Sequence, residues 1–243
     1  MSGHNKWSKI KFTKAAADAK KGKIFARYSH EITLAAKSGG GDVDTNPRLR
    51  AAIEGAKAAS MPKDNIERAI KNAMGKDQKD YKEVPYEGYG PFGIAIFVDA
   101  ATDNTTRTVA NVRAVFNKFG GTLGTQGSLD FMFTQKSVFT FTKKEDLDMD
   151  ELILDLIDYG VEDEYDEEEN EITIYGDPKS FGAIQKTLEE KGFEITGSEF
   201  TRIPNDQKEV TDEHRAIIDK IVERLEEDDD VQNVYTNMKP VGE

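Results

Sequence analysis

Apolar residues recur every three or four positions along three stretches of the first 75 residues, which is the spacing of helices that bury one face. The first stretch begins near Lys23 and is expected to end at Ser38–Gly41, because glycine adopts the left-handed conformation that closes many helices. The second begins at Asn46 and Pro47, and the third begins at Ser60–Pro62, since proline suits the first turn of a helix. The pattern predicts a small bundle of three short helices.

Strands alternate with helices after a polar linker at residues 76–85. Gly93–Asp99 is almost entirely apolar, as expected for a strand that is buried on both faces. A helix that begins at Asn104 and a strand region at Thr122–Phe133 come next. This part of the chain is therefore predicted to be a β-α-β unit.

The remainder contains a full β-α-β-β-α-β series and then a shorter tail. The series consists of strand Val138–Thr142, helix Met149–Tyr159, strands Val161–Tyr165 and Glu171–Tyr175, helix Pro178–Lys191 and strand Phe193–Ile203. This order is typical of ferredoxin-like domains. The tail adds a strand at Lys208–Thr211, a helix at Asp212–Glu227 and a strand at Val231–Thr236, which would complete the earlier β-α-β unit.

These patterns predict a multidomain α+β protein, in which an N-terminal three-helix domain is followed by two ferredoxin-like α/β domains, one inserted in the other. The predicted boundaries are 1–78 for a basic helical domain with an N-terminal arm, 79–130 plus 205–243 for a discontinuous α/β domain, and 131–204 for an inserted, acidic ferredoxin-like domain.

Two glycine-rich sequences resemble phosphate-binding loops but lack the context that such loops need. Gly88–Gly93 matches G-x-G-x-x-G, yet dinucleotide-binding glycines follow a strand and open a helix, whereas these precede a strand. We therefore expect a tight turn here. The loop Gly39–Asp42 could cradle a phosphate with its backbone N–H groups, but no Lys-Ser/Thr pair follows it. A hinge between helices, or a plain helix boundary, explains this loop as well.

Charge is distributed very unevenly along the chain. Residues 1–76 hold sixteen lysines and arginines against seven acidic residues, a net charge of +9, although the whole chain has a net charge of −13. Residues 77–243 therefore carry −22. Such asymmetry predicts that the basic end of the protein faces a polyanion.

The basic end also contains the only tryptophan of the chain. Lysine and arginine neutralise phosphates and release counterions, and an indole ring offers a face on which a base can stack. The predicted nucleic-acid-binding residues are Lys6, Trp7, Lys9, Lys11, Lys14, Lys20, Lys21, Lys23, Arg27, Arg48 and Arg50. The alternative is a solubilising tail on a helical bundle.

The segment Glu145–Glu171 contains fifteen acidic residues and no lysine or arginine. Paired carboxylates could hold Mg²⁺ or Ca²⁺, so an enzyme that uses a metal at Asp163 and Asp166 is one alternative. However, EF-hand spacing is absent, and alternate side chains of a strand point to opposite faces. We expect a solvated acidic surface that repels nucleic acid or meets a basic protein partner, and an adaptor that binds only proteins is a further alternative. We predict no catalytic residue, no metal site and no cofactor.

The composition narrows the remaining classes of protein. The absence of cysteine excludes disulfides, a cysteine nucleophile and thiolate metal sites, and three separate histidines argue against a histidine zinc site. The sequence has neither an apolar run long enough to cross a bilayer nor the hydrophobic core of a signal peptide. A transit peptide is an alternative, but the N-terminus is rich in lysine rather than arginine. We expect a cytoplasmic protein without a membrane partner.

Short sequences spread over the first 130 residues match one known family when they are taken together. They are Gly3–Trp7 (GHNKW), Ala16–Phe25 (AADAKKGKIF), Gly40–Arg50 (GGDVDTNPRLR), Met61–Ala69 (MPKDNIERA), Tyr86–Gly90 (YEGYG), Thr102–Asn104 (TDN), Arg107–Val109 (RTV) and Gly120–Gly124 (GGTLG). In these sequences the chain resembles the YebC family, the YebC/PmpR-type bacterial regulators. It departs from the family at Asn5, where serine is frequent, at Phe12, where histidine is frequent, and at Phe92, where glycine is usual. The change at Phe12 removes a phosphate or base contact, so this position is left out of the predicted site.

The resemblance implies three domains, with one α/β domain inserted in the other, and a role in gene expression that is not enzymatic. Bacterial members are described as DNA-binding transcriptional regulators, whereas mitochondrial relatives act as translational activators. The expectation is therefore a nucleic-acid-binding regulator, in the form of a DNA-binding transcriptional regulatory protein. A translation factor that associates with the ribosome or with rRNA is the alternative.

Overall fold

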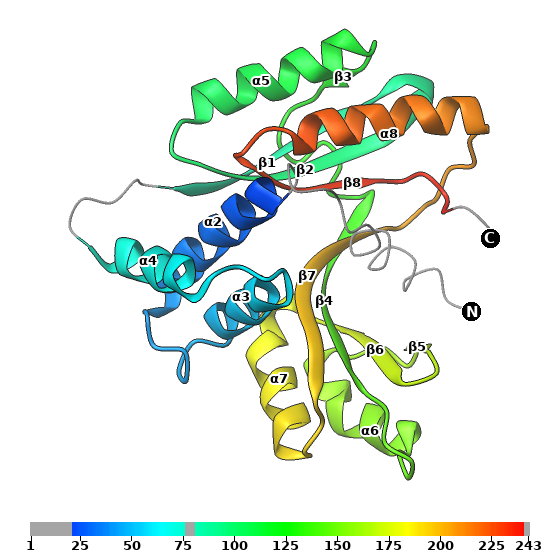
Figure 1. Ribbon diagram of the computed structural model, residues 1–243. Coiled ribbons are helices and arrows are strands. Elements are labelled where there is room, and N and C mark those ends of the chain that lie inside the picture. Colours follow the sequence, from blue (N-terminus) through cyan, green and yellow to red (C-terminus); the bar gives the residue numbers. More distant parts are fainter. Residues whose placement is uncertain (1–20, 76–80, 241–243) are drawn as a thin grey trace.

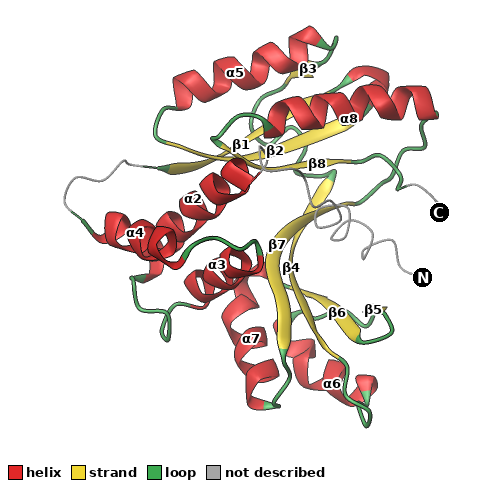
Figure 2. Cartoon of the chain, viewed as in Figure 1, coloured by secondary structure: helices red, strands yellow, loops and turns green. Residues whose placement is uncertain are grey.

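The computed structural model describes residues 21–75 and 81–240 (Figure 1). Within these residues it contains seven α-helices and two four-stranded antiparallel sheets. Figure 2 shows the first of these helices approaching one sheet and the second lying against the other sheet. This position lets the helical part touch both α/β parts of the chain.

The first three helices form the predicted bundle, with α2 at Lys21–Gly39, α3 at Pro47–Ala58 and α4 at Lys63–Met74. Asn46 caps α3 by accepting a hydrogen bond from the backbone N–H of Leu49 at 3.0 Å. The amide of the same side chain donates to the carbonyls of Ala35 and Gly40, both at 2.8 Å. One buried asparagine therefore ends α2 and begins α3, which confirms the helix boundary predicted at this point.

The first sheet has the strand order β3-β1-β2-β8. Its strands are β1 (Lys82–Tyr89), β2 (Ala95–Thr102), β3 (Thr122–Leu123) and β8 (Val231–Thr236), and all neighbours are antiparallel. Helices α5 (Thr105–Lys118) and α8 (Asp212–Glu226) lie side by side over one face of it (Figure 1). Strands β1 to β3 and strand β8 are therefore far apart in the chain but lie in one sheet.

Two expectations for this sheet were wrong. Residues 82–85 are the start of β1 rather than part of a linker, and Lys208–Thr211 contributes only a single bridge, between Lys208 and Met238. In a ferredoxin-like sheet the strand Lys208–Thr211 would lie between β3 and β2, and β1 occupies that position instead. Strand β3 pairs with β1 only at Gly88 and Tyr89, so most of β1 is an edge strand. Charged residues and proline are tolerated at such an edge. They make β1 difficult to recognise as a strand from its sequence.

The strand expected at Thr122–Phe133 was also mostly wrong, since of these residues only Thr122–Leu123 and Phe133 lie in strands. The buried carboxylate of Glu87 accepts hydrogen bonds from the backbone N–H groups of Gly127 at 2.7 Å and Leu129 at 2.5 Å. These groups bind a side chain of β1 instead of a neighbouring strand, so the segment forms turns.

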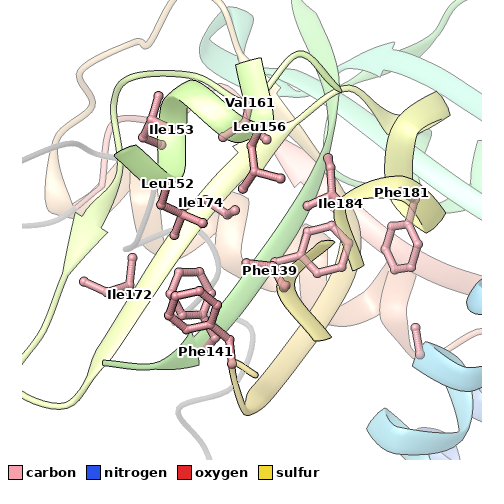
Figure 3. Packing of buried hydrophobic residues seen from close by; sticks show 13 residues of the cluster. Phe139, Phe141, Leu152, Ile153, Leu156, Val161, Ile172, Ile174, Phe181 and Ile184 are labelled. Carbon is pink, nitrogen blue, oxygen red and sulfur yellow. The ribbon is translucent and has the colours of Figure 1, made fainter. Parts of the chain in front are cut away.

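The second sheet has the strand order β5-β6-β4-β7. Its strands are β4 (Phe133–Thr142), β5 (Asp166–Glu167), β6 (Glu171–Gly176) and β7 (Ile195–Pro204), with helices α6 (Met149–Leu156) and α7 (Phe181–Glu190) packed on it. In Figure 3 aromatic and branched side chains of sheet and helices point toward one another, including the fully buried Phe139, Phe141, Leu156 and Ile184. The strand predicted at Val161–Tyr165 was wrong, because the short β5 begins only at Asp166.

The predicted fold class is confirmed: a three-helix part precedes two ferredoxin-like α/β parts, one inserted in the other. The second sheet is built entirely from residues 133–204, whereas the first combines residues 82–123 with β8. The exact domain boundaries stay predictions.

The G-x-G-x-x-G sequence forms a turn, as predicted. It joins β1 to β2 through a short 3-10 turn at Pro91–Gly93, so no α-helix begins at these glycines. Phe92 has φ 64°, in the left-handed region that favours glycine. Its ring stacks on His214, with the centroids 3.6 Å apart and an interplanar angle of 9°.

Candidate nucleic-acid interface

Six of the predicted binding residues, Lys6, Trp7, Lys9, Lys11, Lys14 and Lys20, lie outside the described residues, and so does the side chain of Lys21. The structure places the other four. Lys23 is exposed near the start of α2, whereas Arg27, Arg48 and Arg50 are only partly exposed. The four residues therefore differ in how open they are to a ligand.

Arg50 and Arg48 are held by acidic residues of the α/β parts. Arg50 Nη1 lies 2.8 Å from Oε1 and 2.9 Å from Oε2 of Glu189, which belongs to α7. Its Nη2 donates to the carbonyl of Asp44 at 3.0 Å. Arg48 forms an ion pair with Glu83 of β1. Both arginines therefore join the helical bundle to the rest of the chain.

Arg27 faces the protein as well. Its guanidinium carbon lies 5.1 Å from the centroid of the Tyr28 ring. Burial opposes the charge of Arg27, but Tyr28, Glu31 and Glu199 outweigh this effect and hold the pKa of Arg27 above its usual value. Glu199 lies on β7, so Arg27 interacts electrostatically with the inserted part of the chain.

The structure exposes bases that the sequence prediction had left out of the site. These are Lys57 on α3 and Lys63, Arg68 and Lys71 on α4. Helical spacing carries the signal for α4, because its buried positions Ile66, Ala69 and Ala73 place Arg68 and Lys71 on the opposite, solvent side. Asn72 is exposed beside them.

The exposed side of α4 has the chemistry of nucleic-acid contacts. Arginine and lysine bind phosphates and the major-groove edge of guanine, and asparagine can bind the edge of adenine. Residues 59–62 join α3 to α4, and Ser60 takes the left-handed conformation with φ 61°. A connection of three to four residues is typical of helix-turn-helix motifs. The loop between α2 and α3, at residues 40–46, is longer.

The acidic segment of the inserted part does not gather its carboxylates into one cluster. Asp166 is buried and accepts a hydrogen bond from the Tyr175 hydroxyl at 2.7 Å, whereas Asp163 is exposed. Glu162 and Glu167 form ion pairs with Lys136 and Lys143. Within the described ranges, 21–75 and 81–240, no group of three or more His, Asp or Glu side chains could hold a metal ion.

The TDN and RTV sequences have a structural role in the described part of the chain. Asp230 is 4% exposed, and its Oδ2 accepts hydrogen bonds from Thr102 Oγ1 at 3.0 Å, Thr108 Oγ1 at 2.7 Å and Arg107 Nη2 at 2.7 Å. Burial raises the pKa of Asp230, but the three hydrogen bonds outweigh it and hold that pKa below its usual value. The cluster ties β2 and α5 to the turn that precedes β8.

The chain has a basic helical part ahead of two acidic α/β parts, one of which is inserted in the other. This arrangement defines a class of three-domain proteins, and the comparisons with known proteins agree with it. The chain belongs to the TACO1/YebC family, since residues 5–76 match its N-terminal domain and residues 81–238 match its second and third domain. The resemblance noted from the sequence is thereby confirmed.

Relatives of the chain carry the name of regulators rather than enzymes. A probable transcriptional regulatory protein of Bacteroides fragilis is 73% identical over 218 residues, which cover 90% of this chain and 89% of the relative. A protein of the same name from Geotalea uraniireducens is 49% identical over 238 residues, covering 98% and 95%. The crystal structure of a conserved hypothetical protein from Aquifex aeolicus superimposes with a TM-score of 0.77 at 37% identity and covers 95% and 96% of the two chains.

None of the helices in the described part of the chain is both long enough and apolar enough to span a membrane.

Proposed function

We propose that this chain is a nucleic-acid-binding regulator of gene expression, and specifically a DNA-binding transcriptional regulator that acts in the cytoplasm. The observation that carries the proposal is the separation of charge, with +9 on residues 1–76 and −22 on residues 77–243. A polyanion is attracted to the first part and repelled by the second, so the charges orient the protein on it. The names of the relatives support the same function.

The proposed contacts come from the basic region at the start of the chain and from the exposed side of α4. The first group comprises Lys6, Lys9, Lys11, Lys14, Lys20, Lys21 and Lys23 on phosphates, with Trp7 as a stacking residue. The second comprises Arg68, Lys71 and Asn72. Arg48 and Arg50 must exchange a protein carboxylate for a phosphate, and Arg27 is only partly exposed, so these three are expected to contribute least.

The short connection between α3 and α4 supports DNA as the target. A recognition helix enters the major groove with its exposed side, while the helix before it crosses the backbone. With α4 in that role, its solvent side supplies the arginine, lysine and asparagine that read base edges.

Titration of the full chain with short DNA and RNA duplexes, followed by fluorescence anisotropy, tests the proposal. If about five phosphates are neutralised, log K against log[salt] should have a slope near −4.5 on duplex DNA. Arg68→Gln with Lys71→Gln should weaken binding. The matched control, Lys179→Gln with Lys186→Gln on the inserted part, removes the same charge from exposed positions and should leave binding nearly unchanged. Binding that does not depend on salt would remove the electrostatic premise.

A translation factor that binds rRNA is the second candidate. The observation in its favour is the pairing of a lysine-rich segment with one tryptophan, because unstacked RNA bases are bound by aromatic side chains. Crosslinking in cells, followed by sequencing of the attached nucleic acid, distinguishes the two functions. Promoter DNA among the products supports the transcriptional function, and rRNA without promoter DNA supports the translational one.

The acidic inserted part would contact a basic protein partner under this proposal. Neighbouring exposed carboxylates such as Asp163 and Glu164 are available there, and they repel nucleic acid from that surface. Replacement of both by asparagine and glutamine should weaken capture of a lysine-rich partner and leave the affinity for DNA unchanged. Loss of DNA affinity in this variant would contradict the assignment.

A further inference from the structure

Helix α5 and the loop after it differ in charge from the rest of the α/β parts. Residues 77–243 hold 39 acidic residues among 167, so a stretch of 26 would contain about six of them on average. The stretch from Asn104 to Leu129 contains none, although it includes Arg107, Arg113 and Lys118. Within an acidic frame, this segment is the exception.

The acid-free segment is largely a surface. On α5 the side chains of Val112 and Phe116 are buried against the sheet, while Asn111, Arg113 and Lys118 are exposed. Figure 1 shows α5 at the outer edge of the molecule, with α8 as its neighbour. The helix therefore presents amide groups and two positive charges to solvent.

The positive charges of Arg113 and Lys118 are not neutralised by ion pairs with other described residues. Arg107 differs, because it lies 3.0 Å from Asp103 and 2.7 Å from Asp230 and serves the buried cluster around the latter. Arg113 and Lys118 are therefore free to bind an external anion, and Arg107 is not.

A cleft of about 460 Å³ connects this surface to the basic end of the chain. Lys118 and Asn111 of α5 line one side of it, Arg224 of α8 lines another, and Lys23 of α2 reaches the same cleft. Two acids also line it, but Glu227 forms an ion pair with Arg224, and Asp228 accepts a hydrogen bond from Asn111 at 2.8 Å. The charges left over are the positive ones of Lys23 and Lys118 and the negative one of Asp228, because the Asn111 amide is neutral, so the cleft has a net charge of +1.

The chemistry of this surface suits a phosphate backbone. Lysine, arginine, asparagine and threonine side chains supply most contacts to phosphate and sugar, and this segment has all four and contains no acidic residue of its own. None of the large exposed apolar side chains of the described residues lies on α5, so a hydrophobic protein interface has no anchor there.

We propose that the solvent side of α5, with Lys23 across the cleft, is a second contact surface for the phosphate backbone of the bound nucleic acid. The strand held by the basic end of the chain continues along α5 and meets Lys118 and Arg113. The inference rests on the proposed function and adds a surface of the discontinuous α/β part to it.

The test compares two charge-reversed variants of the full chain by anisotropy titration with one duplex at several salt concentrations. The first is Arg113→Glu with Lys118→Glu, and the control is Lys179→Glu with Lys186→Glu, which changes the net charge equally at exposed positions of the inserted part. Loss of two phosphate contacts should make the salt slope shallower by about 1.8 and weaken binding by roughly tenfold or more at 0.1 M salt. The control should change binding less than threefold.

Each outcome has one meaning. Equal weakening of both variants shows general repulsion and overturns the inference, and so does unchanged binding of the α5 variant. In both cases wild-type binding that depends on salt leaves the proposed function standing. Absence of such binding by the wild type overturns both. Arg113→Ala with Lys118→Ala should give the same reduction in slope without reversed charge, and unchanged circular dichroism shows that the variants fold.

Discussion

Replacement of Asp230 by alanine should destabilise the discontinuous α/β part more than any other single removal of an acidic side chain near α5. The carboxylate is buried, and one of its oxygens accepts three hydrogen bonds from residues more than 120 positions earlier in the chain. It therefore connects β2 and α5 to the turn before β8. No part of this connection is local in sequence.

The magnitude follows from the three partners. A hydrogen bond to a charged group contributes about 1.5–3 kcal/mol when it is buried. The bond to Arg107 is worth at most about 1 kcal/mol, because that side chain is 48% exposed and solvent screens the pair. The two threonine hydroxyl oxygens lie 2.7 Å apart, so one hydroxyl can donate to the other once the carboxylate is removed, and part of their hydrogen bonding survives the substitution. We expect Asp230→Ala to cost about 3 kcal/mol and Asp230→Asn about 2 kcal/mol.

Urea unfolding followed by circular dichroism measures the effect, and Asp103→Asn provides the control. Asp103 shares Arg107 with Asp230, and because the Arg107 side chain is 48% exposed, solvent screens this pair and the loss of Asp103 should cost less than about 1 kcal/mol. If Asp103→Asn destabilises the protein as much as Asp230→Ala, the arginine pair rather than the buried bonds holds the cluster, and the reasoning fails.

The pH dependence supplies an independent check with a fixed sign. The pKa of Asp230 is lower in the folded protein than in the unfolded chain, so its contribution is fully present above the unfolded pKa and is lost as pH falls through the folded pKa. The difference in unfolding free energy between wild type and Asp230→Ala should therefore shrink as the pH falls from about 4 into the strongly acidic range. A difference that stays constant over this range would refute the assignment.

Three further outcomes test the packing. Gly88→Ala should cost at least about 2 kcal/mol in urea unfolding, because a Cβ would lie 2.5 Å from a backbone oxygen of β3, whereas Gly197→Ala, with its nearest neighbour at 3.8 Å, should stay within about 1 kcal/mol. Phe92→Gly should leave stability within about 1 kcal/mol, since relief of the left-handed conformation offsets the lost stacking; a loss above 3 kcal/mol would contradict this. Arg50→Gln and Glu189→Gln should each cost at most about 1 kcal/mol, because their ion pair is partly exposed.

The sequence predicted those features of the fold whose signals are local. The helix starts at Asn46 and Asn104 depend on side chains that accept a hydrogen bond from the backbone N–H three residues later. Each helix also buries one face against the protein core, so its apolar residues recur every three or four positions. Both kinds of signal are complete within a dozen residues, so they can be recognised without the tertiary structure.

The errors have a physical cause in common, which is a partner far away in the chain. Glu87 turns residues 124–129 away from strand structure through hydrogen bonds that span about 40 positions. The early strand β1 is recognisable only beside β2, because on its own it contains proline and charged residues. Such pairings are decided when the chain is compact, and no local pattern encodes them.

The candidate site divides in the same way. The sequence by itself determined that a basic segment precedes an acidic one, since net charge is a property of composition. Only the tertiary structure decided which bases are open, because Arg50 meets its carboxylate 139 residues later and Arg48 meets one 35 residues later, while Arg68 and Lys71 stay exposed. An ion pair needs two side chains within a few ångströms, and folding alone brings Arg50 and Glu189 that close.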